Sequence, residues 1–96
     1  MSAYFVSNIR IHDHQEYGKY LASVDEVFAR FNGKYLALDE HPPVLEGSWD
    51  YTKVVLIEFP SEKDLRAWYE SEDYQAILKH RLQGANCDSL LVKGKV

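Results

Sequence analysis

The amino-acid sequence predicts an α+β domain with the element order βαββαβ. Four short segments have the alternating or continuously apolar composition of strands, and two longer segments carry apolar residues at helical spacing. No internal repeat or low-complexity linker separates them. We therefore expect the 96 residues to form one domain spanning residues 1–96.

The first strand and the first helix have the clearest signals. Residues 3–11 alternate as a half-buried strand does. Asp13 is the expected N-cap of the helix, because Glu16 follows at the capping-box spacing. Asn32-Gly33 supplies the left-handed conformation that ends a helix. One apolar stripe runs along this helix: Tyr17, Tyr20, Leu21, Val24, Val27, Phe28 and Phe31.

Two further strands are expected in the middle of the chain. Residues 34–38 form the second strand, and the prolines of His41-Pro42-Pro43 interrupt it because proline cannot donate to a ladder. Residues 44–46 are expected to resume pairing before the next loop. Residues 53–59 form the third strand.

The second helix and the last strand complete the order. Ser61 caps a helix that turns Leu65, Trp68 and Tyr69 inward, and Ser71 can cap a further helical segment, so this helix can be broken. Residues 89–93 form the last strand. The stripe of the further segment comprises Tyr74, Ile77, Leu78, Arg81 and Leu82. The whole is the ferredoxin-like arrangement, a four-stranded antiparallel sheet with two helices on one face.

The third strand predicts a homodimer. Residues 54–57 read Val-Val-Leu-Ile without alternation, so both faces of this strand should be covered. Two helices cover only one face, and a second copy of the chain is the simplest cover for the other. Apolar types also make up 46% of the chain, more than a small monomer readily buries.

Charge and cysteine content exclude several classes of function. The net charge is −4 and no cluster of Lys and Arg exists, which argues against nucleic-acid and membrane-surface binding. The first residues lack the pattern of an export signal, and Cys87 is the single cysteine, which cannot form an internal disulfide. We therefore expect a cytoplasmic protein.

Most of the chain resembles a known family, domain of unknown function 1330. The resembling residues are Asp13 with Tyr17 and Tyr20, Leu45-Glu46-Gly47 with Trp49, residues 54–61, and residues 67–75 with Arg81. The resemblance implies a dimeric α/β barrel, in which two ferredoxin-like sheets face each other. That superfamily includes small monooxygenases, isomerases, haem-handling proteins and stress-induced proteins. The family itself has no agreed activity.

Arg81 is the most informative candidate for a binding site. It lies on an apolar stripe, so its charge must be paired or must bind an anion. Glu58, in the middle of an apolar strand, is its expected counterpart, and Glu46 is a weaker candidate beside a loop. The alternatives are an Arg81 that extends to water or forms a structural ion pair, and a Glu58 that faces water at the barrel mouth.

Aromatic residues could wall a pocket near Arg81. The candidates are Trp49, Trp68, Tyr69, Tyr17 and Tyr20. The alternative is that they are core, which is the expectation for Trp68 and the Tyr17/Tyr20 pair.

No cofactor or metal is expected. His12, His14, His41 and His80 show no ligand spacing, and neither a phosphate loop nor a dinucleotide fingerprint is present. Cys87 has no basic sequence neighbour that would activate it as a nucleophile.

Two functional hypotheses follow. In the first, each subunit binds a small anionic or aromatic ligand between helices and sheet. Arg81 holds the anion, Glu58 or Glu46 moves a proton, and Trp68, Tyr17 and Tyr69 line the wall. Any catalysis would then be cofactor-independent proton transfer or oxygenation. The second hypothesis is a non-catalytic dimeric module that senses a ligand or is structural.

Overall fold

The computed structural model describes residues 1–95, and Val96, the last residue of the predicted domain, lies outside the described residues. The elements are β1 (Ala3–Ile11), α1 (His14–Phe28), β2 (Lys34–Asp39), β3 (Lys53–Phe59), α2 (Glu62–Tyr69), α3 (Glu72–Gly84) and β4 (Ala85–Lys93). The expected order βαββαβ is confirmed, with the second helix broken into α2 and α3 at Ser71.

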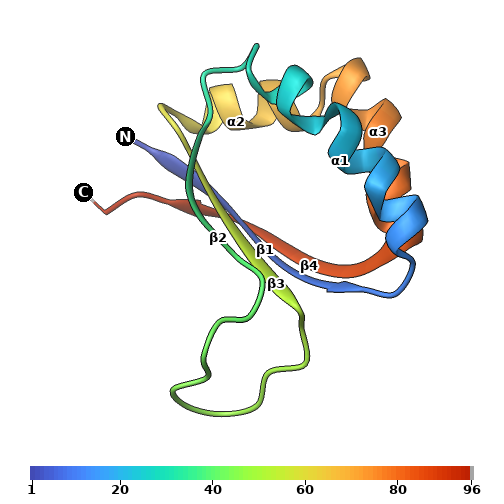
Figure 1. Cartoon of the computed structure of the whole chain (residues 1–96). Coiled ribbons are helices and arrows are strands. Elements are labelled where there is room, and N and C mark those ends of the chain that lie inside the picture. The colour runs from blue at the N-terminus through green and yellow to red at the C-terminus, as the bar shows by residue number, and fades with distance from the viewer. Residues whose placement is uncertain (96) are drawn as a thin grey trace.

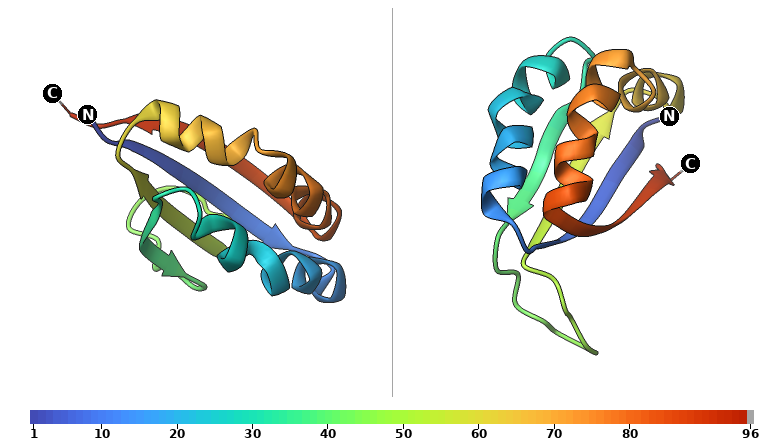
Figure 2. Two further views of the ribbon diagram at one scale, coloured as in Figure 1. Left: turned by 90° about the horizontal axis from the view of Figure 1, so that it is seen from above. Right: turned by 90° about the vertical axis from the view of Figure 1, so that its right-hand side faces the viewer.

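The four strands form one antiparallel sheet in the order β2-β3-β1-β4. β1 lies in the interior and pairs with β3 on one side and with β4 on the other. The helices pack on one face of the sheet, and the other face is open (Figures 1 and 2). This is the ferredoxin-like arrangement that the sequence predicts.

Two strand predictions need correction. Residues 44–46 do not resume pairing but lie in the loop between β2 and β3, because the β2–β3 ladder ends at Asp39 opposite Val54. β4 begins at Ala85 instead of Ser89, since β1 extends to Ile11 and offers ladder partners to residues 85–88. These residues have no strong hydrophobic pattern. They belong to the strand because their backbone pairs with β1.

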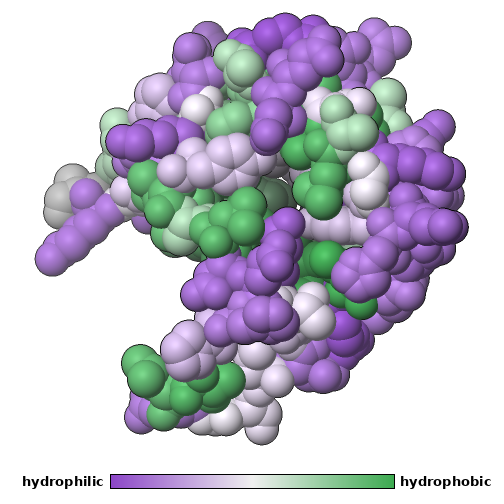
Figure 3. Space-filling view, viewed as in Figure 1, coloured by the Kyte–Doolittle hydropathy of each residue, from purple (hydrophilic) through white to green (hydrophobic). Residues whose placement is uncertain are grey.

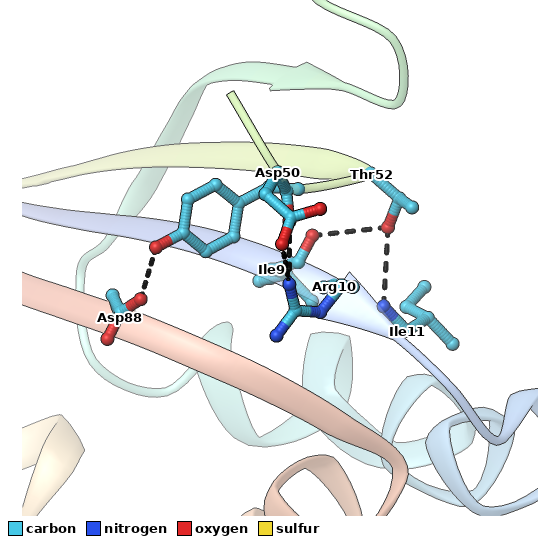
Figure 4. Close-up of polar contacts among 7 residues, drawn as sticks. Ile9, Arg10, Ile11, Asp50, Thr52 and Asp88 are labelled. Atoms are coloured by element: carbon cyan, nitrogen blue, oxygen red, sulfur yellow. Dashed lines mark hydrogen bonds and ion pairs between the residues drawn. The ribbon is translucent and has the colours of Figure 1, made fainter. Parts of the chain in front are cut away.

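The loop of residues 40–52 is attached to the sheet at its return end (Figure 4). The Thr52 backbone N donates to the Ile9 carbonyl at 2.8 Å, and its hydroxyl donates to the same oxygen at 3.1 Å. The Ile11 backbone N in turn donates to the Thr52 hydroxyl at 3.3 Å. Arg10 forms an ion pair with Asp50 beside these bonds. The loop therefore delivers the chain to Lys53 at a fixed position.

The far end of this loop is apolar and exposed. Tyr51 donates to Asp88 of β4 and packs edge-on against Trp49, with ring centroids 5.0 Å apart. Beyond them, Val44 and Leu45 are exposed, Leu45 at 93%, and apolar side chains gather at the loop tip in Figure 3. This tip projects away from the helical layer (Figure 1).

The N-terminal cap of α1 forms as the sequence predicts. Asp13 Oδ1 accepts from the backbone N of Gln15 and of Glu16, each at 3.1 Å. Asn32 adopts the left-handed conformation with φ 62°. α1 itself ends at Phe28. The start of α1 is therefore set by the predicted cap, but its end is not set by Asn32-Gly33: the helix stops four residues earlier, and Phe31 lies in the turn between them.

The C-terminus of α3 lies directly against the N-terminus of α1. A Cβ atom at Gly84 would lie 2.6 Å from the Tyr17 backbone nitrogen, so only glycine allows this approach. The Gly84 carbonyl accepts from the backbone N of His12 and of Asp13, both at 3.0 Å. This contact places Arg81, one turn before Gly84, beside Tyr17 of α1.

The core is centred on Trp68, which is fully buried. Its ring lies 4.2 Å from that of Tyr74, 5.1 Å from that of Phe5 and 5.3 Å from that of Phe59. The expectation that Trp68 belongs to the core and not to a pocket wall is therefore met. Aromatic packing of this kind fills the end of the helical layer where α2 lies.

Candidate functional site

A cavity of about 360 Å³ lies between α1 and the helix-covered face of the sheet. We call it the main cavity. Ser7 and Ile9 of β1 and Val55 of β3 form part of its floor, and Tyr17 and Tyr20 of α1 form part of its roof. It occupies the half of the helical layer that Trp68 does not fill, and its walls are mostly apolar.

Arg81 contributes one positive charge to the main cavity. It lies in α3, is only 2% exposed, and donates from Nη1 to the Ser7 hydroxyl at 3.2 Å. Its guanidinium carbon lies 5.8 Å from the ring centroids of both Phe5 and Tyr20. Its Nε has no hydrogen-bond partner among the described residues. The charge is thus held by a hydroxyl and two aromatic rings, not by an acid.

Lys53 contributes a second positive charge, which the sequence analysis missed. It is the first residue of β3, is 5% exposed, and its amine donates to the Tyr17 hydroxyl at 3.4 Å. Burial lowers the pKa of Lys53, and the charge of Glu40 opposes this shift. A period-two signal could have revealed it, because Lys53 shares a strand face with Val55 and Ile57.

No acid pairs with either cation. Within residues 1–95, no carboxylate forms an ion pair with Arg81 or Lys53. Asp25 is the one acid that lines the main cavity, but it is exposed at the rim and accepts from the Tyr35 hydroxyl at 3.3 Å. The interior of the cavity is therefore cationic, although the chain as a whole carries a net charge of −4.

The tyrosines of the main cavity are hydrogen-bond donors at neutral pH. Burial raises the pKa of Tyr17 to about 12 and raises the pKa of Tyr20 well above its usual value. The Tyr20 and Tyr74 hydroxyls lie 2.8 Å apart and hydrogen-bond to each other. Protonated hydroxyls can donate to an anion or to a carbonyl oxygen.

The prediction that Arg81 pairs with Glu58 is wrong. Glu58 lies on the open face of the sheet, where its carboxylate accepts from the Tyr4 hydroxyl at 3.3 Å. Because successive side chains of a strand alternate, Ile57 faces the helices while Glu58 faces away from Arg81. The sequence analysis placed Glu58 in β3 correctly and left its face open, and the error was to pair it with Arg81.

Three other candidates also lie outside the main cavity. Glu46 is exposed in the loop of residues 40–52, where no contact relates it to Arg81. Trp68 is core, and Tyr69 lines a separate hollow of about 240 Å³ between α2 and β4. Of the residues that the sequence suggests for the pocket, the structure brings together Arg81, Tyr17 and Tyr20 in the main cavity.

The histidines and the cysteine do not assemble into a further centre. The described part of the chain contains no group of three or more His, Cys, Asp or Glu side chains placed to hold a metal. His80 Nδ1 lies 2.8 Å from Glu16 Oε1, and this hydrogen bond lowers the pKa of Glu16. Cys87 is half-buried, and burial raises the pKa of its thiol.

The family resemblance is confirmed. Residues 2–95 match the family model described as Domain of unknown function (DUF1330). The chain belongs to this family. A search of curated protein sequences finds no match to this chain. Over residues 1–95, no helix is both long enough and apolar enough to cross a membrane.

Three crystal structures share the fold of this family member. RPA0582 of Rhodopseudomonas palustris, of unknown function, has a TM-score of 0.80 at 20% identity, with 99% of this chain and 83% of that chain covered. SnoaB of Streptomyces nogalater, a cofactor-independent oxygenase, has a TM-score of 0.69 at 14% identity, with 99% and 94% covered. A dimeric ferredoxin-like protein of unknown function from Thermobifida fusca has a TM-score of 0.68 at 14% identity, with 98% and 92% covered. At identities this low, structural similarity shows that the fold is shared. It does not show that the activity is shared.

Replacing Arg81 tests whether its charge has an internal acidic partner. We expect Arg81→Met to change the free energy of unfolding by no more than about 1 kcal/mol, because loss of the Ser7 and ring contacts is offset by removal of an unpaired buried charge. No acid is stranded, so mildly acidic pH should not alter the difference. Urea unfolding at two pH values and one protein concentration measures this. A large loss that acid relieves would reveal an acidic partner in the assembled protein.

Replacing Lys53 tests the lowered pKa of its amine. Its ordinary pKa is 10.5, and burial lowers the folded value, so charged Lys53 destabilises the fold at neutral pH. This penalty fades as the pH rises through the folded pKa towards 10.5. We therefore expect Lys53→Met to be more stable than wild type at neutral pH and to lose that advantage at alkaline pH.

Urea unfolding of both proteins across this pH range measures the effect. Lys63→Met in α2 is the matched control, because the exposed Lys63 side chain has no burial penalty to remove. A Lys53→Met advantage that is absent or independent of pH would contradict the interpretation.

Proposed function

We propose that each subunit binds a small organic anion with an aromatic or other apolar body in the main cavity. The observation that carries this proposal is the presence of two buried cations, Arg81 and Lys53, with which no acid of residues 1–95 forms an ion pair. The proposed site, like that of the first sequence hypothesis, is between helices and sheet, with Lys53 in place of the expected acid.

The energetics favour an anionic occupant. A buried cation without a counter-ion is unfavourable by several kcal/mol or more, so a ligand carboxylate that pairs with it would regain much of this energy. The guanidinium of Arg81 suits a carboxylate because its fork of donors matches two oxygens. The apolar walls and the volume of about 360 Å³ suit a ligand the size of a substituted benzene ring.

The cavity also has the groups that cofactor-independent chemistry needs. Lys53 can accept a proton when its amine is neutral, and the Tyr17 hydroxyl can donate a hydrogen bond to a developing oxyanion. SnoaB, which has the same fold, is a cofactor-independent oxygenase. We propose proton transfer or oxygenation of a bound anion as the reaction class. The competing function is a non-catalytic dimeric module, favoured by the contacts of Arg81 with Ser7, Phe5 and Tyr20.

We propose that the open face of the sheet is the interface of a homodimer. It presents half-buried Val54 and Leu56 of β3 and exposed Leu90 and Val92 of β4, with Val6 between them on β1. A single chain leaves these apolar side chains in contact with water, which a second copy would relieve. Proteins of this fold from two other organisms are described as dimeric.

Ligand titration tests the proposed anion site. We expect benzoate and phenylacetate to bind to the protein in isothermal titration and their neutral methyl esters to bind much more weakly. Arg81→Met should weaken carboxylate binding roughly 10- to 100-fold, the range of a charge-assisted hydrogen bond. Arg66→Met, which removes an exposed arginine of α2, is the matched control. Equal binding of acids and esters, or equal binding by wild type and Arg81→Met, would support the non-catalytic module.

Light scattering coupled to gel filtration tests the dimer. We expect twice the chain mass of 11.2 kDa for wild type and the monomer mass for Leu90→Asp, which places a charge on the open face. Leu82→Asp is the matched control, because Leu82 is similarly exposed, at 55% against 65% for Leu90, but lies on α3. A wild-type monomer, or a dimer that only Leu82→Asp disrupts, would contradict this interface.

A further inference from the structure

We infer that Lys53 is a carbonyl-reactive amine and that the anion of the main cavity is an oxo acid, a carboxylate that also carries a ketone or aldehyde. Arg81 would hold the carboxylate, and the Lys53 amine would condense with the carbonyl carbon. This inference rests on the proposed function, since the anion must first bind. It adds the chemical class of the ligand and a covalent step.

The position of Lys53 makes its amine accessible from two sides. Lys53, Tyr17 and Leu21 line both the main cavity and a second cavity of about 360 Å³, which we call the vestibule. The vestibule is otherwise lined by Ile11, His14, Gly18, Glu40, His41 and Thr52. Lys53 therefore lies between the main cavity and a cavity with more polar residues in its wall. A ligand can reach it from the first, and water can leave through the second.

The amine of Lys53 is not held by an acid. Its one hydrogen bond among the described side chains is to the Tyr17 hydroxyl, at 3.4 Å. Other lysines differ: Lys19 pairs with Glu16 at 3.0 Å and Lys93 with Glu62 at 3.7 Å, and both are exposed. Burial lowers the pKa of Lys53, which raises the fraction of nucleophilic neutral amine at neutral pH. Lys53 thus combines burial with a place on a cavity wall and forms no ion pair, although the charge of Glu40 acts on it from the vestibule.

The step conserves atoms and electrons. The neutral amine nitrogen attacks the carbonyl carbon, a carbon–nitrogen bond forms, and the carbonyl oxygen is protonated to a carbinolamine. The Tyr17 hydroxyl, which burial keeps protonated, lies beside the amine and can donate a hydrogen bond to that oxygen. One amine proton is on this oxygen in the carbinolamine. The hydroxyl group then leaves together with the second amine proton as water, and an imine remains. No oxidant, reductant or cofactor is required for this step.

Reductive trapping tests the inference. The protein is incubated with phenylpyruvate, and separately with 4-formylbenzoate, in the presence of sodium cyanoborohydride. We expect a mass increase equal to the acid less one oxygen atom, mapped by peptide analysis to Lys53. Labelling of Lys53 should be several-fold faster than that of any exposed lysine, because its neutral amine is more populated and the carboxylate site holds the probe beside it. Two probes are used because they place the carboxylate at different distances from the carbonyl.

Lys53→Arg separates this inference from the anion site. Arginine keeps the positive charge but cannot form the imine, so labelling in the cavity should be lost, and benzoate titration of the same variant measures what the substitution does to the anion site. Arg81→Met should slow trapping by both probes. In wild type, phenylacetate, which has no ketone or aldehyde, should protect Lys53 from labelling, and this measurement does not depend on the folding of a variant.

The two proposals fail differently. Labelling spread evenly over exposed lysines, or labelling of Lys53 that phenylacetate does not reduce, overturns the inference even if benzoate binds. Absence of benzoate and phenylacetate binding to wild type overturns the anion site itself. Labelling of Lys53 that needs Arg81 and that phenylacetate blocks supports both.

Discussion

The approach of α3 to α1 at Gly84 is the constraint on which the site depends. With a Cβ atom excluded at that position, the two helices meet backbone to backbone, and the Gly84 carbonyl caps the turn that leads into α1. Arg81 is one helical turn earlier, so this contact sets its depth above β1, where it reaches Ser7. The same contact sets Tyr17 above Lys53. One close approach of two helices thus positions Arg81 and the tyrosine that contacts Lys53, while Lys53 itself is placed by β3.

The helix-covered face of the sheet is divided into a filled half and a hollow half. Around Trp68, aromatic rings from α2, α3 and the strands pack closely, and Trp68 lines no part of the main cavity. Toward the other end, β1 places the small Ser7 where its neighbours Phe5 and Ile9 are large, and the guanidinium of Arg81 takes the vacated space. A larger side chain at position 7 would close the site by packing. The hollow is therefore a feature of the sequence of β1 and not of imperfect core packing.

The fold was predictable from the sequence because its signals are local, whereas the site depends on side-chain direction. The caps at Asp13 and Ser61 and the period of each apolar stripe require only neighbouring residues, and they placed the helices correctly. Glu58 was assigned to a strand correctly but to the wrong partner, because a run of apolar residues conceals which face each side chain takes. Lys53 was overlooked because lysine at a strand start is usually exposed. Counting by twos from Phe59 places it on the buried face.

The alternation of β3 assigns adjacent residues to separate tasks. Lys53, Val55 and Ile57 face the helices and border the main cavity, while Val54, Leu56 and Glu58 face the open side. This explains why residues 54–57 do not alternate between apolar and polar types. One face of the strand packs against the helices, and the other face is the proposed dimer interface, so both need apolar residues. The sheet residues that line the main cavity point toward the helices, away from the proposed interface. A partner on the open face would then stabilise the strands beneath the cavity without adding side chains to it, so assembly and ligand binding can be altered independently by substitutions one residue apart.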